Sequence, residues 1–155
     1  MTVSAIPAGQ QAVTPYLAID GGVAALEFYK KAFGATETYR LIMPDGRLGH
    51  AEIRLAGCVI MLADEFPEYG GKAPTTLGGS PVSIHLYVDD VDTFFKRAVA
   101  AGAKERKPIQ DQFYGDRSGQ LEDPSGHLWW VATHKEDVPP EELQKRVNAM
   151  FGGKS

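Results

Sequence analysis

The sequence has 155 residues, of which 43% are hydrophobic, so the chain can bury a core of ordinary size. The formal net charge is −4 and the basic residues are scattered, so nucleic acid is not an expected partner. No stretch approaches the roughly 20 apolar residues of a membrane span, and the N-terminus has neither a basic nor an apolar leader region. We therefore expect no membrane partner and a cytoplasmic location. The single cysteine, Cys58, lies in an apolar run and is expected to be a buried, unreactive thiol.

The first half of the chain is predicted to form one strand, one helix and three further strands. The helix begins after the turn Asp20-Gly21-Gly22 and ends at Gly34, a residue that favours the left-handed conformation of helix ends. Turns at Pro44-Asp45-Gly46 and Ala56-Gly57 separate the last three strands. The predicted ranges are a strand at 13–19, a helix at 23–33 and strands at 35–42, 50–55 and 58–63. This βαβββ order defines a first module over about 13–63.

The same order of elements begins again after the segment 64–81. That segment is rich in Gly and Pro and has no apolar period, so it is expected to be a linker or a mobile lid. The ranges predicted for the second module, over about 82–134, are a strand at 82–88, a helix at 91–101 and strands at 105–109, 118–122 and 127–133. A terminal helix is predicted over about 139–151. We expect a single domain over 1–155.

An internal repeat supports two equivalent modules. The segment 14–20 matches the segment 83–89 at an offset of 69 residues, and the two helices match at an offset of 68. The positions paired by the offset of 69 include Leu17 with Leu86, Gly46 with Gly115, Gly57 with Gly126 and Met61 with Trp130. Both modules are therefore predicted to share their hairpin positions and the start of their last strand.

Three motifs of the second half resemble the second module of vicinal oxygen chelate proteins, the superfamily of glyoxalases, bleomycin resistance proteins and extradiol dioxygenases. These motifs are Ser83–Asp92, Ala101-Gly102-Ala103 and Asp123-Pro124-Ser125-Gly126-His127. The stretches that are similar to the PhnB-like branch are His50-Ala51-Glu52, Met61–Glu65, Tyr114–Arg117 and Gly126–Trp130. The resemblance implies an α+β fold of two βαβββ modules in tandem, each a curved mixed sheet with a helix on its convex face, plus a C-terminal helix. The ligand cavity then lies on the concave face, and methyltransferase activity is not expected.

The resemblance also locates the positions where metal-dependent members carry their ligands. In this sequence the four matching positions are Thr14, Met61, Ser83 and Trp130. Divalent metal ions need imidazole, carboxylate or thiolate ligands, and these four side chains supply at best weak neutral donors. We expect no metal at this site and no other cofactor.

Strand alternation predicts which side chains face the cavity, because residues of one parity share a face. The inward set comprises Thr14, Tyr16, Met61, Ser83, His85, Tyr87 and Trp130. The opposite set, predicted to pack under the helices, comprises Leu17, Ile19, Ile60, Leu62, Leu86, Val88, Trp129 and Val131. On the third strand Ile53 and Leu55 join the helix side, which leaves His50, Glu52 and Arg54 inward.

Two functions fit this inward set. The favoured one is binding of a small, partly hydrophobic or aromatic molecule without a metal, and its ligand-binding candidates are Tyr16, His50, Met61, Tyr87 and Trp130. The alternative is a glyoxalase-like lyase or isomerase in which His85 or Glu52 transfers a proton, with or without a relocated metal held by His50, Glu52 and His85.

Several of these residues also have purely structural interpretations. An inward aromatic ring can simply fill the barrel, and His85 can be a hydrogen-bonded structural histidine. Glu52 and Arg54 can form only an ion pair, Asp116 and Arg117 can hold a hairpin together, and His127 can cap its turn.

A homodimer is predicted, because a half-barrel module leaves a sheet edge unpaired and family members often complete their cavities across two chains. The terminal helix places Leu143, Val147 and Met150 on one side, where they can clasp a partner.

Overall fold

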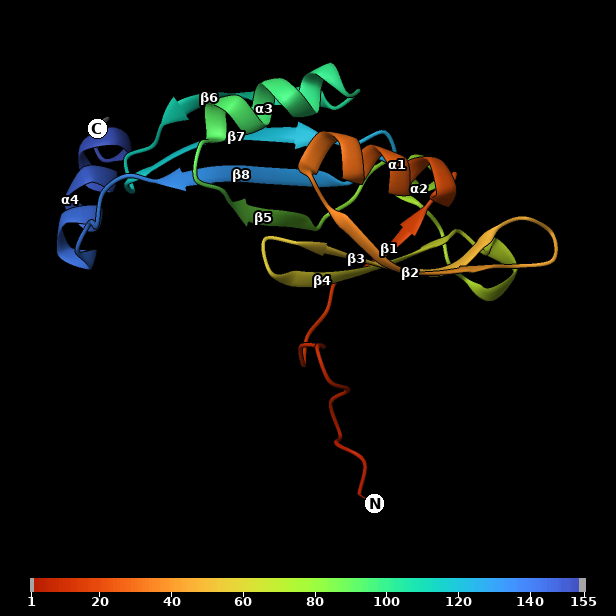
Figure 1. The fold of residues 1–155 in the computed structure, drawn as a ribbon. Helices are drawn as coiled ribbons and strands as arrows, with labels where there is room; N and C mark the ends of the chain where they lie inside the picture. The colour runs from red at the N-terminus through yellow and green to blue at the C-terminus, as the bar shows by residue number, and fades with distance from the viewer. Residues whose placement is uncertain (1, 154–155) are drawn as a thin grey trace.

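The first of two four-stranded sheets comes from the N-terminal half of the chain, in a computed structural model that describes residues 2–153 (Figure 1). Its elements are β1 (Tyr16–Ile19), α1 (Gly22–Phe33), β2 (Thr36–Ile42), β3 (Leu48–Leu55) and β4 (Cys58–Asp64). The strand order is β1-β4-β3-β2, with β1 parallel to β4 and the other pairs antiparallel. The strand β1 begins after Pro15, which has no N–H to donate to a ladder, so the predicted start at residue 13 was too early.

The second sheet repeats this arrangement. Its elements are β5 (Ser83–Tyr87), α3 (Val91–Ala100), β6 (Lys104–Asp111), β7 (Asp116–Glu122) and β8 (Leu128–His134). The strand order is β5-β8-β7-β6, and again only the first pair, β5 with β8, is parallel. The pairing of Met61 with Tyr16 and of Trp130 with His85 follows the predicted offset of 69 residues.

The segment between the sheets is more ordered than its composition indicates. It forms the short 3-10 helix η1 (Pro67–Tyr69) and the helix α2 (Pro74–Leu77), which ends at Gly78 in the left-handed conformation. The carboxylate of Glu65 accepts hydrogen bonds from the Ala73 amide at 2.7 Å and from the Thr76 hydroxyl at 2.8 Å. At Gly126 an added Cβ would lie only 3.0 Å from the Cβ of Pro74, so α2 packs closely against the turn between β7 and β8.

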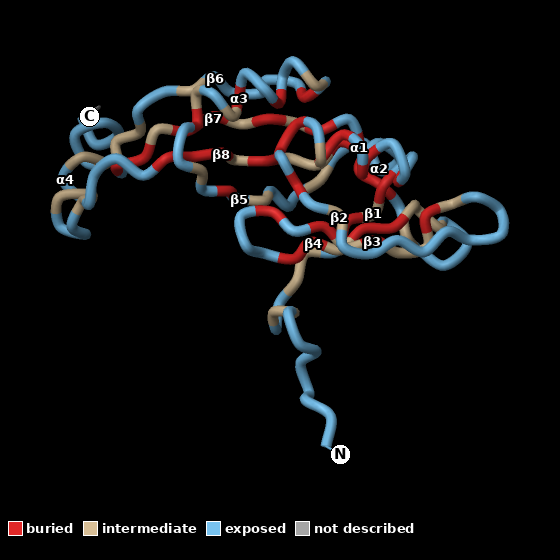
Figure 2. The backbone as a smooth tube through the Cα atoms, viewed as in Figure 1, coloured by how far each residue is buried: buried red, intermediate tan, exposed pale blue. Residues whose placement is uncertain are grey.

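The two modules share one hydrophobic core, in which α1 packs beside α3 (Figures 1 and 2). The ring of Phe33 at the end of α1 lies 5.2 Å from that of Phe94 in α3 and 4.9 Å from that of Trp129 in β8, centroid to centroid. The predicted helix-side set is correct: its core members are Leu17, Ile19, Ile60, Leu62, Leu86, Trp129 and Val131, with Ile53 and Leu55 beside them and Val88 packed against them. Alternation along the strands thus places the apolar side chains under the helices.

A buried carboxylate links the modules through the core. The Tyr29 hydroxyl of α1 and the Trp129 indole N–H both donate to one oxygen of Asp123, the latter at 2.9 Å. The backbone amides of Ser125 and His127 donate to the other oxygen at 2.9 and 3.0 Å. Burial, followed by the negative charge of Asp123, raises the pKa of Tyr29 well above its ordinary value. The hydroxyl therefore stays protonated and keeps donating to the carboxylate.

The two ends of the chain lie outside this core. Figure 2 shows the N-terminal segment projecting from the first sheet as exposed backbone, and α4 (Pro140–Phe151) at the far end of the second sheet. The side chain of Arg146 attaches α4 by donating to the Phe113 carbonyl at 2.8 Å and to Glu136 at 2.9 Å. Contrary to the sequence-based expectation, Cys58 is exposed, because it begins β4 directly after the hairpin turn.

Candidate functional site

Each sheet has one face against the helices and a second face, which we call its open face. Strand register places side chains of the open faces in cross-strand rows. The row of the first sheet is Tyr16, Met61, Glu52 and Tyr39. The equivalent row of the second sheet is His85, Trp130, Gln120 and Lys107. The predicted inward residues of the strands therefore lie on the open faces, whereas Thr14 precedes β1.

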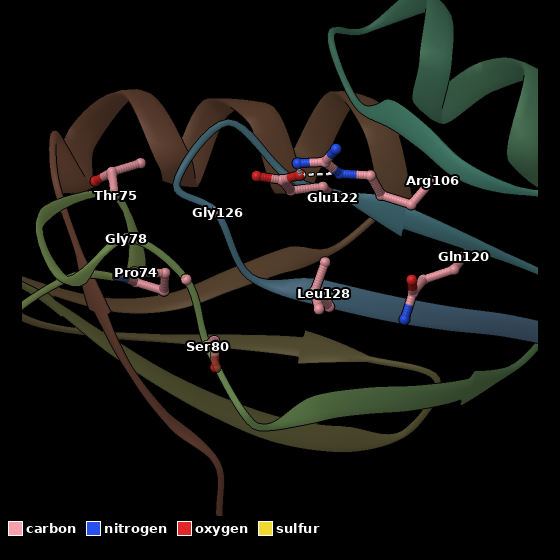
Figure 3. A pocket seen from close by; sticks show the side chains of 10 residues that line it. Pro74, Thr75, Gly78, Ser80, Arg106, Gln120, Glu122, Gly126 and Leu128 are labelled. Carbon is pink, nitrogen blue, oxygen red and sulfur yellow. Dashed lines mark hydrogen bonds and ion pairs between the residues drawn. The ribbon is translucent and has the colours of Figure 1, made fainter.

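A hollow of about 570 Å³ lies beside the row of the second sheet (Figure 3). The linker forms one wall with Pro74, Thr75 and the segment 78–80. Strands of the second sheet form the other wall, and their lining residues are Arg106, Gln120, Glu122 and Leu128. Figure 3 shows the ion pair of Arg106 with Glu122 at the edge of this hollow. Trp130 does not line this hollow, but it shares a sheet face with two residues that do, because Gln120 pairs with it and Leu128 lies two residues before it on β8.

Trp130 is the large aromatic surface of this open face. Its ring is only partly buried, in contrast to the neighbouring Trp129, whose side chain is fully buried. The ammonium group of Lys107 lies 5.1 Å from the centre of the Trp130 ring. The His85 Nδ1 atom lies 3.5 Å from the Trp130 carbonyl oxygen, and the His85 and Tyr87 rings are 4.6 Å apart. A flat apolar surface thus adjoins a cation, an amide and an imidazole.

The open face of the first sheet carries a connected polar network instead. The Tyr16 hydroxyl lies 2.7 Å from His50 Nδ1, and His50 Nε2 lies 3.4 Å from one oxygen of Glu52. The Gln10 amide donates to the other oxygen of Glu52 at 2.8 Å. Partial burial, with a smaller contribution from the negative charge of Glu52, raises the pKa of Tyr16. Its hydroxyl is therefore protonated near neutral pH and is available as the donor to His50.

The structure separates the predicted site residues into two groups. Tyr16, His50, Glu52 and Met61 lie on the first sheet, and His85, Tyr87 and Trp130 lie on the second. Within residues 2–153, no three His, Cys, Asp or Glu side chains come close enough together to hold a metal ion. The suggested metal site of His50, Glu52 and His85 is therefore not formed in this part of the chain. The four family ligand positions, two of which are Met61 and Trp130, also lack a donor set that fits a divalent ion.

A second polar cluster, which the sequence did not reveal, joins β7 and β8 near α4. The buried Asp116 accepts from the Tyr87 hydroxyl at 3.0 Å and contacts His134 Nδ1 at 2.7 Å. The other nitrogen of His134 lies 2.9 Å from Asp137. Hydrogen bonds to these two carboxylates, Asp116 first, raise the pKa of His134. The cluster therefore favours a protonated His134, which clamps the start of the α4 segment to the sheet.

The structure gives the partners of three polar residues whose roles the sequence left open. Arg117 bonds to Asp92 of α3 at 2.8 Å and to Asp111 at 3.2 Å, so an Asp–Arg contact does hold the β6–β7 hairpin, whereas alternation sends the Asp116 side chain to the opposite face. Arg54 donates to the Gly9 carbonyl at 2.8 Å and does not pair with Glu52. 

The His127 amide donates to Asp123 within its own turn at 3.0 Å, and its Nε2 atom also contacts the Ala18 carbonyl at 2.9 Å, which links the second module to the first.

Three residues of the open faces were missed. Gln10 lies in the polar N-terminal lead, which has no periodic pattern, and it reaches Glu52 only through the folded chain. Gln120 lies on a predicted strand, and its position opposite Trp130 could have been found from the register of the last hairpin. Lys107 lies between two register shifts in the pairing of β6 with β7, so simple alternation does not assign its face.

The fold defines a glyoxalase-type protein, in which each of two tandem βαβββ modules packs one helix on a mixed four-stranded sheet. Residues 17–131 match the family model of the Glyoxalase/Bleomycin resistance protein/Dioxygenase superfamily. The chain belongs to this superfamily, as the sequence motifs indicated.

Similar proteins extend this assignment. An uncharacterized protein of Mycobacterium tuberculosis is 43% identical over 147 residues, which cover 93% of this chain and 86% of that protein. The crystal structure of TioX from Micromonospora sp. ML1 has a TM-score of 0.63 at 27% identity, covering 80% of this chain and 98% of TioX. A PhnB protein from Bacillus cereus is described as a putative 3-demethylubiquinone-9 3-methyltransferase. Its structure has a TM-score of 0.62 at 20% identity, and the match covers 79% of this chain and 99% of that protein. At that identity the likeness concerns the fold alone.

The helices of the described segment, residues 2–153, include none that is long and apolar enough to cross a bilayer.

Proposed function

We propose that this protein binds a small, planar, partly hydrophobic molecule on the open face of the second sheet, with Trp130 as the stacking surface. The single observation that carries the proposal is a partly exposed Trp130 on the same sheet face as Gln120 and Leu128, which line a hollow of about 570 Å³. A volume in this range suits a small ligand. An indole that only filled the interior would be expected to be as buried as Trp129.

The polar groups around Trp130 indicate how a ligand would be oriented. Lys107 and Gln120 adjoin the ring from one side and supply N–H donors, and His85 adjoins it from the other. Because Lys107 is a positively charged donor and Gln120 a neutral one, this side favours a ligand that carries an acceptor or an anionic group beside its aromatic ring. Tyr87 extends the aromatic surface next to His85.

A fluorescence titration with 1-anilinonaphthalene-8-sulfonate tests the proposal, because this probe combines a planar ring with an anionic group. The change Trp130→Leu should raise the Kd at least about fivefold, since an aromatic pair contributes about 1 kcal/mol beyond burial. Tyr69→Leu is the matched control, because Tyr69 is highly exposed on η1 and lies on neither open face. Equal Kd values for wild type and Trp130→Leu would refute the proposal.

The ligand site belongs, in this proposal, to a homodimer. Side chains of both open faces are strongly exposed in the single chain, among them Tyr16 at 55% and Tyr87 at 56%. The side of α4 that carries Leu143, Val147 and Met150 is likewise not buried. A second copy that covers these surfaces would enclose the ligand. Light scattering at micromolar concentration should return twice the chain mass, and a monomer would reject the dimer.

A proton-transfer enzyme remains the second candidate, and one observation favours it. The chain from Tyr16 through His50 to Glu52 could pass a proton from a bound substrate to a carboxylate. His85 offers less, because its hydrogen-bond contact is the Trp130 carbonyl at 3.5 Å. Turnover that depends on Glu52 but not on Trp130 would decide for this candidate.

Two finer expectations complete the proposal. We propose that the chain is a member of the PhnB-like branch of the superfamily, and the resemblance of the stretches around His50, Met61 and Trp130 supports this. The exposed thiol of Cys58 is compatible with a reducing compartment, so a cytoplasmic location is part of the proposal.

A further inference from the structure

The open face of the first sheet carries a carboxylate that is occupied by an internal amide. Glu52 projects from β3, one of the two inner strands of the sheet, and accepts a hydrogen bond from the Gln10 side chain at 2.8 Å. The adjacent residue, Gln11, fixes this part of the N-terminal segment to β4. The Gln11 amide donates to the Val59 carbonyl at 2.8 Å and accepts from the Val59 amide at 3.0 Å.

The contact with Glu52 satisfies the amide nitrogen of Gln10 but leaves its amide oxygen without a partner. The Gln10 Oε1 atom is buried and has no hydrogen-bond partner. The amide cannot be turned around to correct this, because its oxygen would then face the carboxylate oxygen of Glu52. A buried acceptor without a donor costs free energy that an exposed one does not. Another N–H donor can therefore replace Gln10 on Glu52 at low cost, and release of Gln10 would return its oxygen to water.

The surroundings of Glu52 indicate which donor would replace Gln10. A cationic N–H group forms a stronger hydrogen bond to a carboxylate than a neutral amide does. The rings of Tyr16 and Tyr39 lie 5.4 and 5.9 Å from the His50 ring, so two aromatic surfaces flank the network. Aromatic faces attract cations as well as apolar rings. The one cation on the same strand face, Arg54, is held to the Gly9 carbonyl at 2.8 Å.

We infer that the open face of the first sheet is a binding site for an aromatic organic cation, whose amidinium or ammonium group takes the place of Gln10 on Glu52. This site is separate from the Trp130 hollow and does not rest on the function proposed for that hollow. Gln10 is then an internal competitor of the ligand, and Glu52 is the group that recognises the cation.

Benzamidine is a suitable probe, and its Kd can be followed from the chemical shifts of the β3 backbone amides. The change Gln10→Ala should lower the Kd about fivefold, because it removes the competitor. The isosteric change Glu52→Gln should raise the Kd at least about tenfold, because it removes the charge. Tyr69→Leu, a change on η1 outside both open faces, should leave the Kd unchanged, and benzoate, which has the opposite charge, should not shift the β3 amides.

The two variants must move the Kd in opposite directions. A higher Kd for Gln10→Ala would show that Gln10 belongs to the site and would overturn the inference. An unchanged Kd for Glu52→Gln would also overturn it, as would the absence of saturation in both the wild type and Gln10→Ala. None of these results depends on the response of the Trp130 hollow to the anilinonaphthalene probe, so the two proposals can fail independently.

Discussion

Removal of one hydroxyl should measure how strongly the buried carboxylate joins the two modules. The change Tyr29→Phe keeps the ring in the core and deletes only the donor to Asp123. The carboxylate keeps its bond from Trp129 at 2.9 Å and its two backbone amides. A hydrogen bond to a charged group contributes about 1.5–3 kcal/mol. In a domain of this size that loss lowers Tm by about 3–12 °C.

The assay is urea and thermal unfolding of wild type, Tyr29→Phe and the control Tyr39→Phe. Tyr39 lies half-exposed on the open face, so its hydroxyl should contribute within about 0.5 kcal/mol. The pKa of Tyr29 is raised in the folded state, so its contribution to stability is present below about pH 10 and is lost as the pH rises through the folded pKa. Tyr29→Phe should therefore lose less stability than wild type as the pH becomes alkaline. Identical unfolding midpoints for wild type and Tyr29→Phe would refute the reasoning.

Three further predictions concern the second module and the metal. The pKa of His134 is raised in the folded state, so its clamp stabilises the fold below about pH 6.5 and is lost as the pH rises through the folded pKa. The free energy of unfolding should therefore differ less between pH 6 and pH 9 for His134→Gln than for wild type. An equal difference in both proteins would contradict the clamp. Gly115 has a φ of 102°, and an added Cβ would collide with the Glu136 carbonyl, whereas its repeat partner Gly46, with a φ of 88°, faces open space. Calorimetry should show that Gly115→Ala lowers the free energy of unfolding by about 1–3 kcal/mol more than Gly46→Ala does. Equal losses would argue against the close contact. Dialysis against EDTA should leave the Kd for the anilinonaphthalene probe unchanged, because the family ligand positions lack metal donors; weaker binding after dialysis, restored by a metal, would count against the metal-free site.

The order of the elements, the repeat and the buried faces could be predicted because each depends on local patterns. Alternation along a strand fixes a face whatever the rest of the chain does, as Leu17 and Trp129 demonstrate. The helix α2 was missed because its four residues are too few for an apolar period, although Pro74 and Gly78 mark its start and end. Short elements of this kind carry end signals but no periodic signal.

The candidate sites could be predicted only in part, because their contacts join distant parts of the chain. Trp130 was found by the repeat, and His50 and Glu52 by their spacing on one strand. The bond between Gln10 and Glu52 spans 42 residues, and no local pattern places the N-terminal segment across that sheet. The face of Lys107 depends on bulges in β6, which alternation cannot foresee.

The central claim, that a planar ligand binds against Trp130, can be tested with the two indole N–H signals in a ¹H–¹⁵N spectrum. The chain has two tryptophans, and they differ sharply in environment: Trp129 donates to the buried Asp123, whereas Trp130 lies on the open face of the second sheet, with the Lys107 ammonium over its ring. Addition of 1-anilinonaphthalene-8-sulfonate should shift the Trp130 indole signal in a saturable manner and leave the Trp129 signal in place. Saturable binding of the probe by fluorescence, with the Trp130 signal unmoved, would contradict the account.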